Sequence, residues 1–530
     1  MRLPIATVLS LVVLSSDASA NRTWVVDPLG TGDFTVLAPA LAAAADGDTV
    51  LVLPGSQAGG PLVIDGKGIS VLANARAPFN ERFPEIVVRN VPAGSVTLLR
   101  RLELAAESAT APGIKVENCA GRVRIESCHS TGFAGADVRS CTDVTIVSSL
   151  LSGYDPGRLQ PVPVTAALHV VDSLVVVDES VVAGQNGAFP QSGGLFCIED
   201  AGDGTTAVAA KGSSIVRLIG GIVRAGFPGP AEGPCKGGAF ASAVFASSGA
   251  HVVQRDVDLV GSTALEGGSF VELAGERRAF VVTDHVRSEG AVRVRASGDP
   301  GEVLFALVAQ DLGTRYLGDE TGTYQMPNVI PGGRIFLGVL DGAGRLEVDL
   351  PVPATAADET DALFVQGAFI SSSGTVRLAA VRSVTVFGDD VPVRVAGETV
   401  HVDPSAASAG AGTSWQAPTS DLDGQLRRAF ASVGSPVSFW LREGFHRAGP
   451  AGTAAEIVFM VPGTRLLGGF AGTETEEGQR DPLVRTSWVD GDRNGDDQPG
   501  FVNRADNASR LLDARGTVFR PTMISGVGFR

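Results

Sequence analysis

The sequence has few lysines, few aromatic residues and no basic cluster. Four of its 42 basic residues are Lys, aromatic residues make up 6% of the chain, and the formal net charge is −16. Nucleic acids and anionic membranes are bound through clustered Lys and Arg, so neither is an expected partner. The preference for Arg over Lys indicates a GC-rich bacterial genome, and the acidity is compatible with calcium binding.

No long apolar run follows the N-terminal segment, so no transmembrane helix is expected. The N-terminus has the pattern of a signal peptide: Arg2, then the apolar residues 3–14, then small residues at 18–20. Cleavage after Ala20 would leave Asn21 as the first residue. The sequence therefore predicts a bacterial protein that is secreted or displayed at the cell surface.

Common catalytic and metal-binding motifs are also missing. GxSxG, HExxH, CxxC and the P-loop are absent, and the six His are scattered without partners at a useful spacing. The five cysteines therefore do not indicate zinc, and two interpretations stay open. They are either small buried hydrophobic residues or members of one or two disulfides, which export permits. They are Cys119, Cys128, Cys141, Cys197 and Cys235.

The chain contains a duplicated start. Residues 24–55 and the stretch from His401 both open with Val-Asp-Pro, and both continue through a Gly-rich turn, a helix candidate, a short strand and a Gly. The helix candidates span residues 35–45 and 419–432. Because self-similarity marks repeated architectures, the duplication predicts two domains that begin in the same way.

Short strands recur through residues 21–290. The apolar stretches 123–125 and 144–146 are offset by 21 residues, and Cys119 and Cys141 by 22. This spacing predicts coils of a parallel β-helix, with loops inserted at one corner. A β-sandwich is the alternative. The helix candidate before the first strand favours the β-helix, because a stack of coils needs a cap over its first coil.

Residues 46–55, DGDTVLVLPG, and the apolar stretches 62–65 and 69–72 resemble the start of pectin-lyase-like right-handed parallel β-helix proteins. The resemblance implies an all-β fold in which a right-handed parallel β-helix with an N-terminal cap helix occupies residues 21–290. After the signal peptide, 1–20, this is the first predicted domain.

Two further domains are predicted. Residues 291–392 have longer, alternating strands separated by Pro and Gly, which is typical of a small β-sandwich module. Residues 393–530 contain LLGGFAGTE (466–474) and QRDP (479–482), which resemble bacterial β-helix proteins of the polymorphic outer-membrane-protein type. That family continues for several more coils. We therefore expect either that the chain is truncated at Arg530 or that another molecule covers the last coil.

The pectin-lyase-like resemblance implies where active sites would lie. The esterase motif Gly-x-Tyr-x-Glu is absent at residues 55–59, and Gly388-Asp389-Asp390, without a Gly-His-Gly, is read as a turn rather than a polygalacturonase pair. Lyases of the superfamily use Asp-bound calcium and an Arg or Lys base. The charged residues in the corresponding coils, which are alternatively only solvent-facing charges, are Asp172, Asp178, Glu179, Arg217, Arg224 and Arg255.

One segment of the third domain has the pattern of a calcium loop. Asp490, Asp492, Asn494 and Asp496 place oxygen ligands at alternate positions, with Gly between them for a tight turn. The loop differs from an EF-hand because its twelfth position is Phe501. The competing interpretation is an acidic surface turn.

The leading functional hypothesis is a secreted, non-enzymatic protein with a surface, adhesive or glycan-contacting role, and an extracellular polysaccharide or cell-surface component as partner. The alternative is a carbohydrate-active enzyme, a polysaccharide lyase or hydrolase. Residues 21–290 contain Trp24 and Tyr154 as their only Trp and Tyr. This scarcity of aromatic platforms for sugar rings argues against a processing groove, and no catalytic residues are assigned.

Overall fold

The computed structural model describes most of residues 21–530. The segments outside the description are 1–20, 56–60, 75–82, 107–110, 154–165, 187–190, 193–196, 200–202, 232–234, 274–277, 319–320, 327, 407–409, 432–435, 448–457, 460, 462, 493–510 and 514–521. The predicted signal peptide therefore lies outside it. The described chain is all-β with large parallel sheets, which confirms the predicted class. No helix of the described residues is long and apolar enough to cross a membrane.

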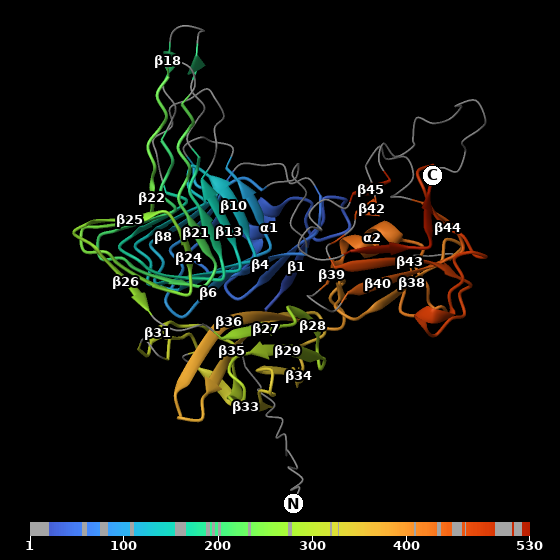
Figure 1. Ribbon diagram of the computed structural model, residues 1–530. Helices are drawn as coiled ribbons and strands as arrows, with labels where there is room; N and C mark the ends of the chain where they lie inside the picture. The colour runs from blue at the N-terminus through green and yellow to red at the C-terminus, as the bar shows by residue number, and fades with distance from the viewer. Residues whose placement is uncertain are drawn as a thin grey trace, which may run out of the picture.

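Three long parallel sheets occupy the first half of the described chain (Figure 1). The ten-stranded sheet contains β1 (Thr23–Val26), β2 (Thr49–Val52), β4 (Ser70–Ala73), β6 (Val96–Arg100), β9 (Arg122–Glu126), β12 (Asp143–Val147), β15 (Leu174–Asp178), β20 (Ile215–Ile219), β23 (His251–Arg255) and β26 (Ser269–Leu273). The six-stranded sheet contains β7 (Glu103–Ala105), β10 (His129–Gly132), β13 (Leu150–Gly153), β16 (Val181–Ala183), β21 (Ile222–Arg224) and β24 (Asp258–Val260). The eight-stranded sheet contains β3 (Leu62–Asp65), β5 (Ile86–Arg89), β8 (Ile114–Glu117), β11 (Ala136–Arg139), β14 (Leu168–Val171), β19 (Val208–Lys211), β22 (Ser242–Ser247) and β25 (Ser262–Glu266).

From β6 onward the chain visits the three sheets in turn, and we call the resulting assembly the stack. β9, β10 and β11 belong to the ten-, six- and eight-stranded sheets, and β12 then returns to the ten-stranded sheet beside β9. Val123 pairs with Val144 and Ile125 with Ile146, both in parallel register. The 21-residue offset seen in the sequence is therefore the length of one circuit.

Two corners of each circuit are tight turns. The corner after the ten-stranded sheet has residues with positive φ, such as Ser127 (54°) and Ser148 (49°). The corner between the eight-stranded sheet and the next strand of the ten-stranded sheet also has residues with positive φ, such as Asn118 (56°) and Ser140 (52°). A single left-handed residue turns the chain sharply and lets the next strand begin. The long insertion 154–165 falls at the third corner, between β13 and β14.

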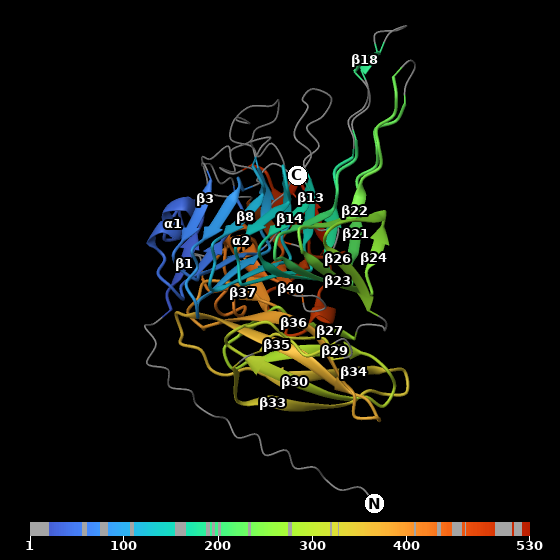
Figure 2. The ribbon, with the colours of Figure 1, turned by 90° about the vertical axis from the view of Figure 1, so that its left-hand side faces the viewer.

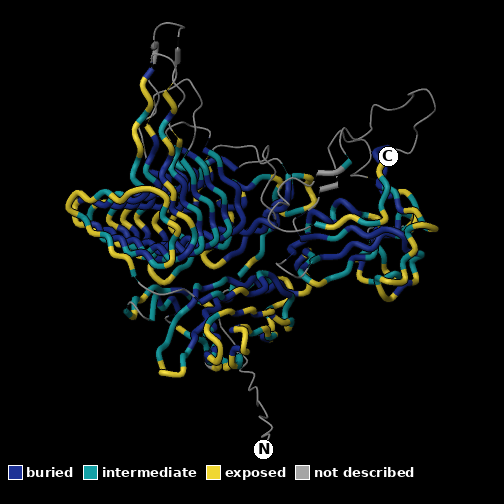
Figure 3. The backbone as a smooth tube through the Cα atoms, in the orientation of Figure 1, coloured by how far each residue is buried: buried dark blue, intermediate teal, exposed yellow. Residues whose placement is uncertain are grey.

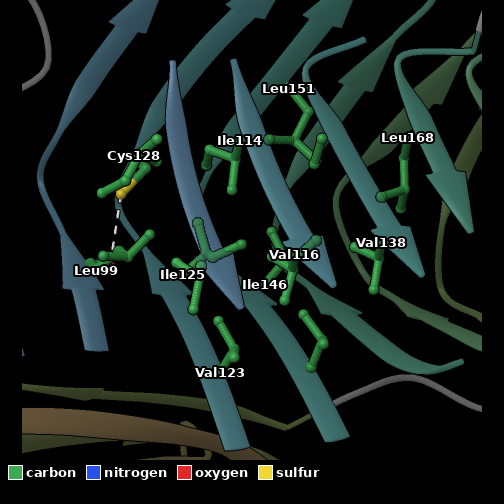
Figure 4. Packing of buried hydrophobic residues seen from close by; sticks show 14 of the residues in the cluster. Leu99, Ile114, Val116, Val123, Ile125, Cys128, Val138, Ile146, Leu151 and Leu168 are labelled. Carbon is green, nitrogen blue, oxygen red and sulfur yellow. Dashed lines mark hydrogen bonds between the residues drawn. The ribbon is translucent and has the colours of Figure 1, made fainter. Parts of the chain in front are cut away.

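Apolar side chains fill the interior of the stack (Figure 4). Val123, Ile125, Ile146, Val116 and Val138 are fully or almost fully buried there, in rows that run from one circuit to the next. This arrangement follows from strand periodicity, because every second side chain points inward.

Helix α1 (Leu37–Ala43) contributes Leu37, Ala40 and Leu41 to the same core, in the segment predicted to be helical. Cys119, Cys128 and Cys141 are buried and form no disulfide, whereas Cys235 is disulfide-bonded. Both sequence interpretations of the cysteines therefore hold, each for different residues.

The middle of the chain forms two further sheets. One contains β27 (Ala279–Val282), β29 (Ala291–Ser297) and β34 (Arg345–Pro351); the other contains β28 (His285–Arg287), β36 (Val376–Phe387), β35 (Thr360–Ile370), β30 (Val303–Ala309) and β33 (Val329–Val339). A short hairpin, β31 (Arg315–Tyr316) and β32 (Thr323–Tyr324), extends from them. We call these elements the middle module, and Figures 1 and 2 both show it lying against the stack.

The last part of the chain repeats the beginning of the first. β38 (Thr399–Val402) pairs in parallel with β40 (Val437–Arg442), as β1 does with β2, and α2 (Leu422–Arg427) lies between them in sequence. Two parallel sheets result; they contain β38, β40, β43 (Thr464–Phe470) and β46 (Met523–Ser525), and β41 (Gly444–Arg447), β44 (Ser487–Asp490) and β47 (Val527–Phe529). Leu422 and Leu426 of α2 are buried in their core.

The remaining elements are short. They are the strand pairs β17 (Gln191–Ser192) with β18 (Cys197–Glu199), β37 (Arg394–Val395) with β39 (Ala429–Phe430), and β42 (Val458–Phe459) with β45 (Leu512–Asp513), and the 3₁₀ helix η1 (Glu477–Gln479).

Candidate functional site

A cleft opens where the outer face of the ten-stranded sheet meets the middle module. β15, β20, β23 and β26 form one wall, and β36 and the β31–β32 hairpin form the other. Its polar lining side chains are Asp178, Glu179, Arg217, Gln254, Arg255, Arg278, Tyr316, Thr323, Gln325 and Arg377.

A contact between Arg217 and Tyr316 crosses the cleft. The guanidinium carbon of Arg217 lies 4.2 Å from the centroid of the Tyr316 ring. Within the described residues, no carboxylate lies within ion-pair distance of Arg217. Burial lowers the pKa of Arg217, and the charge of Asp143 raises it, with a net lowering. An arginine remains protonated despite such a shift. The cleft therefore holds a cation whose hydrogen-bonding capacity is not used by an acidic side chain.

The carboxylate of Glu179 is already engaged. It accepts a hydrogen bond from Arg382 of β36, and Arg382 is itself fixed by donating to the Phe280 carbonyl and the Ser148 hydroxyl, each over 3.0 Å. Its neighbour Asp178 is 4% exposed. Glu179 thus joins the stack to the middle module. It is poorly placed to move a proton during catalysis, because its role is to neutralise a buried guanidinium.

Two other arginines of the cleft have acidic partners. Arg278 donates to Glu302 through Nε and Nη2, over 2.8 Å in each case. Arg377 lies 3.5 Å from Asp299. Both are therefore less available to a ligand than Arg217.

Gln254 is 5% exposed, and its Oε1 atom has no hydrogen-bond partner within the described residues. A ligand hydroxyl that reached this oxygen would satisfy it.

The structure brings together four of the six charged residues that the sequence placed in the coils. Asp178, Glu179, Arg217 and Arg255 line the same cleft. Asp172 lies at another corner, where it accepts a hydrogen bond from the Ser213 amide over 2.9 Å. Arg224 belongs to the six-stranded sheet. The alternative of solvent-facing charges does not hold for Asp178, which is buried, whereas Glu179, Arg217 and Arg255 are partly exposed.

Sequence reasoning missed Tyr316, Gln325 and Arg377, which all come from the middle module. Tyr316 lies outside the predicted β-helix of residues 21–290, and no local pattern connects it with Arg217. The signal that was available is that the chain has three Tyr and that Tyr316 and Tyr324 flank one short turn.

The predicted calcium loop is only partly described. Asp490 and Asp492 are buried at the end of β44, and Asn494 and Asp496 lie outside the described residues. Asp490 accepts hydrogen bonds from Arg530 over 2.6 Å and from the Asp492 amide over 3.2 Å. Across the described segments, no group of three or more His, Cys, Asp or Glu is arranged to hold a metal. Calcium at this loop stays a prediction.

No protein-family model matches the sequence, and no curated protein matches it either. The cleft is therefore interpreted from its own chemistry.

Proposed function

We propose that this protein is a secreted β-helix protein that binds glycans at a surface without turning them over. In this proposal the stack is a right-handed parallel β-helix of the pectin-lyase-like type, with α1 as its cap. Residues 393–530 begin a second β-helix with α2 in the same role. The parallel circuits and the repeated strand–helix–strand start support this interpretation.

The observation that carries the proposal is the contact between Arg217 and Tyr316. An aromatic ring packs against the apolar face of a sugar, and a guanidinium donates paired hydrogen bonds to a carboxylate or hydroxyls. Arg217 lies 4.2 Å from the Tyr316 ring, and no carboxylate of the described residues lies within ion-pair distance of it. The cleft thus combines stacking and hydrogen bonding, as glycan binding requires.

Binding is favoured over catalysis because of Glu179. A glycoside hydrolase needs two carboxylates that are free to act as acid and as base or nucleophile. In the cleft, the Glu179 carboxylate is held by Arg382, which is also bonded to Phe280 and Ser148. The enzyme remains the second candidate, because Asp178, Arg217 and Arg255 do converge on the same cleft.

The test is titration calorimetry of the mature protein with a panel of acidic and neutral extracellular polysaccharides. We expect binding to at least one member and, in Arg217→Ala, a loss of at least tenfold in affinity. Arg334→Ala is the matched control, because Arg334 is an exposed arginine of β33. Absence of binding to the whole panel would overturn the proposal.

Catalysis is followed on the same mixtures through new reducing ends and through the ultraviolet absorbance of unsaturated products. Turnover of any polysaccharide of the panel, lost in Arg217→Ala and kept in Arg334→Ala, would establish the enzyme instead.

A further inference from the structure

All three sheets of the stack end at the same circuit. β26, β24 and β25 are the last strands of the ten-, six- and eight-stranded sheets. The end is largely exposed, as Figure 3 shows for this part of the backbone. The opposite end differs, because α1 packs its apolar face into the core there. One end of the stack therefore presents three strand edges without a neighbouring strand in the described residues.

The free edge of β26 has main-chain groups directed away from the stack. The Ser269 amide donates to the Ala250 carbonyl over 2.9 Å, toward β23. Successive residues of a strand direct their amides to opposite sides. The amides of Phe270 and Glu272 therefore point away from β23. Such an edge is a template for one further strand.

The three edge strands also carry apolar side chains that are partly exposed. Leu259 and Phe270 are only partly buried where they pack against the core. Val260, Leu265 and Val271 are 39%, 49% and 39% exposed. A segment that covered this end would bury apolar surface while pairing its main chain, which is how strand addition recognises peptides.

The charge of the edge strands favours a basic partner over a second copy of this chain. Asp258, Glu266 and Glu272 place one carboxylate on each edge strand, and no cation of the described residues lies within 4.0 Å of any of the three. Pairing two copies of this end would bring these carboxylates together, which is unfavourable. A partner with basic side chains would instead neutralise them.

We propose that this end of the stack binds an extended peptide segment with basic and apolar side chains, which adds to β26 as a further strand. This inference does not depend on the proposed glycan site, since it rests on other residues and another surface.

The test uses the mature protein and fluorescence anisotropy of labelled seven-residue peptides. The basic probe alternates Lys and Val, and the acidic probe alternates Glu and Val. We expect the basic probe to bind at least tenfold more tightly. Methylating the main-chain nitrogens of the basic probe should weaken it at least fivefold, because it removes the donors of the added strand.

Two pairs of variants separate charge from main-chain pairing. Glu266→Lys should weaken binding of the basic probe at least fivefold. Asp389→Lys also replaces an acidic residue by Lys, at an exposed site of another region, and should leave this binding unchanged. Glu272→Gln and Glu272→Pro both remove the charge, but only Pro also removes the outward amide. Because proline is tolerated where an edge amide faces solvent, Glu272→Pro should still fold. Since it lacks the outward amide, it should bind the basic probe more weakly than Glu272→Gln.

Three results would overturn the inference. These are equal binding of the acidic and basic probes, equal effects of Glu266→Lys and Asp389→Lys, and no binding of the basic probe at millimolar concentration. Sedimentation velocity provides a fourth: a dimer that Glu266→Lys alters would identify a second copy of this chain as the occupant.

Discussion

Arg124 donates from Nε to Oε2 of Glu126 over 2.7 Å, and the two side chains lie between the stack and the middle module. Arg124 is 0% exposed and Glu126 is 5% exposed. Arg124 also donates from Nη2 to the Val381 carbonyl of β36 over 2.6 Å, and Ser383 donates to Glu126 over 2.8 Å. A buried ion pair on the ten-stranded sheet is thus completed by the main chain and a hydroxyl of another module.

Removing the charge of Glu126 should strongly destabilise the protein. In Glu126→Gln, the buried Arg124 would lose its counterion, which typically costs about 3–5 kcal/mol. Urea unfolding should show this loss. The control is Glu347→Gln, because Glu347 forms an exposed pair with Arg295 and should change the free energy of unfolding by less than about 1 kcal/mol. Equal effects of the two variants would contradict the structural role of Glu126.

His446 should make stability depend on pH. It is 2% exposed; burial lowers its pKa to about 4 from 6.5, while the Arg442 carbonyl and Asp403 act in the opposite direction. Between pH 4 and pH 6.5, the unfolded state therefore binds more protons than the folded state. The stabilisation is complete above pH 6.5 and is lost as the pH falls through 4, by about 3 kcal/mol in total.

The measurement is urea unfolding of wild type and His446→Gln at several pH values from 4 to 7. The variant should lose about 3 kcal/mol less than wild type across this range. Parallel curves for the two proteins would show that His446 does not contribute.

Tyr316 should contribute to glycan affinity through its ring. Tyr316→Ala removes the ring that faces Arg217 and that would pack against a sugar. Affinity for a bound polysaccharide should therefore fall by about 1–2 kcal/mol, or roughly tenfold. Tyr316→Phe keeps the ring and should retain most of the affinity. Calorimetry on both variants checks this, and an equal loss in the two would assign the effect to the hydroxyl instead.

Calcium should stabilise residues 393–530 slightly if the loop at Asp490 binds it. Asp490 is held by Arg530 over 2.6 Å, so the ion would have to share or displace this partner. A site with a Kd near ~1 mM adds only about 1 kcal/mol at several millimolar calcium. Thermal melts with calcium and with a chelator should differ by a small upward shift that Asp492→Asn removes. Identical melts would identify an ordinary acidic turn.

Much of the architecture could be predicted from local patterns. The 21-residue offset between Val123 and Val144 became one circuit of the stack, and the repeated Val-Asp-Pro start marked two strand–helix–strand beginnings. Both signals survive in sequence because each circuit repeats the same alternation of inward and outward side chains, and contacts only its neighbours.

The cleft could not be predicted in the same way. Arg217 and Tyr316 belong to different modules, as do Glu179 and Arg382. Strand alternation places Arg124, Asp178 and Arg217 outside the core of the stack, and Glu179 lies in the turn after β15. Alternation cannot distinguish a solvated charge from one covered by another module. Tertiary packing decided which outward charges became buried ion pairs and which remained available. The sequence thus determined the circuits, and the docking of the middle module on the ten-stranded sheet made the site.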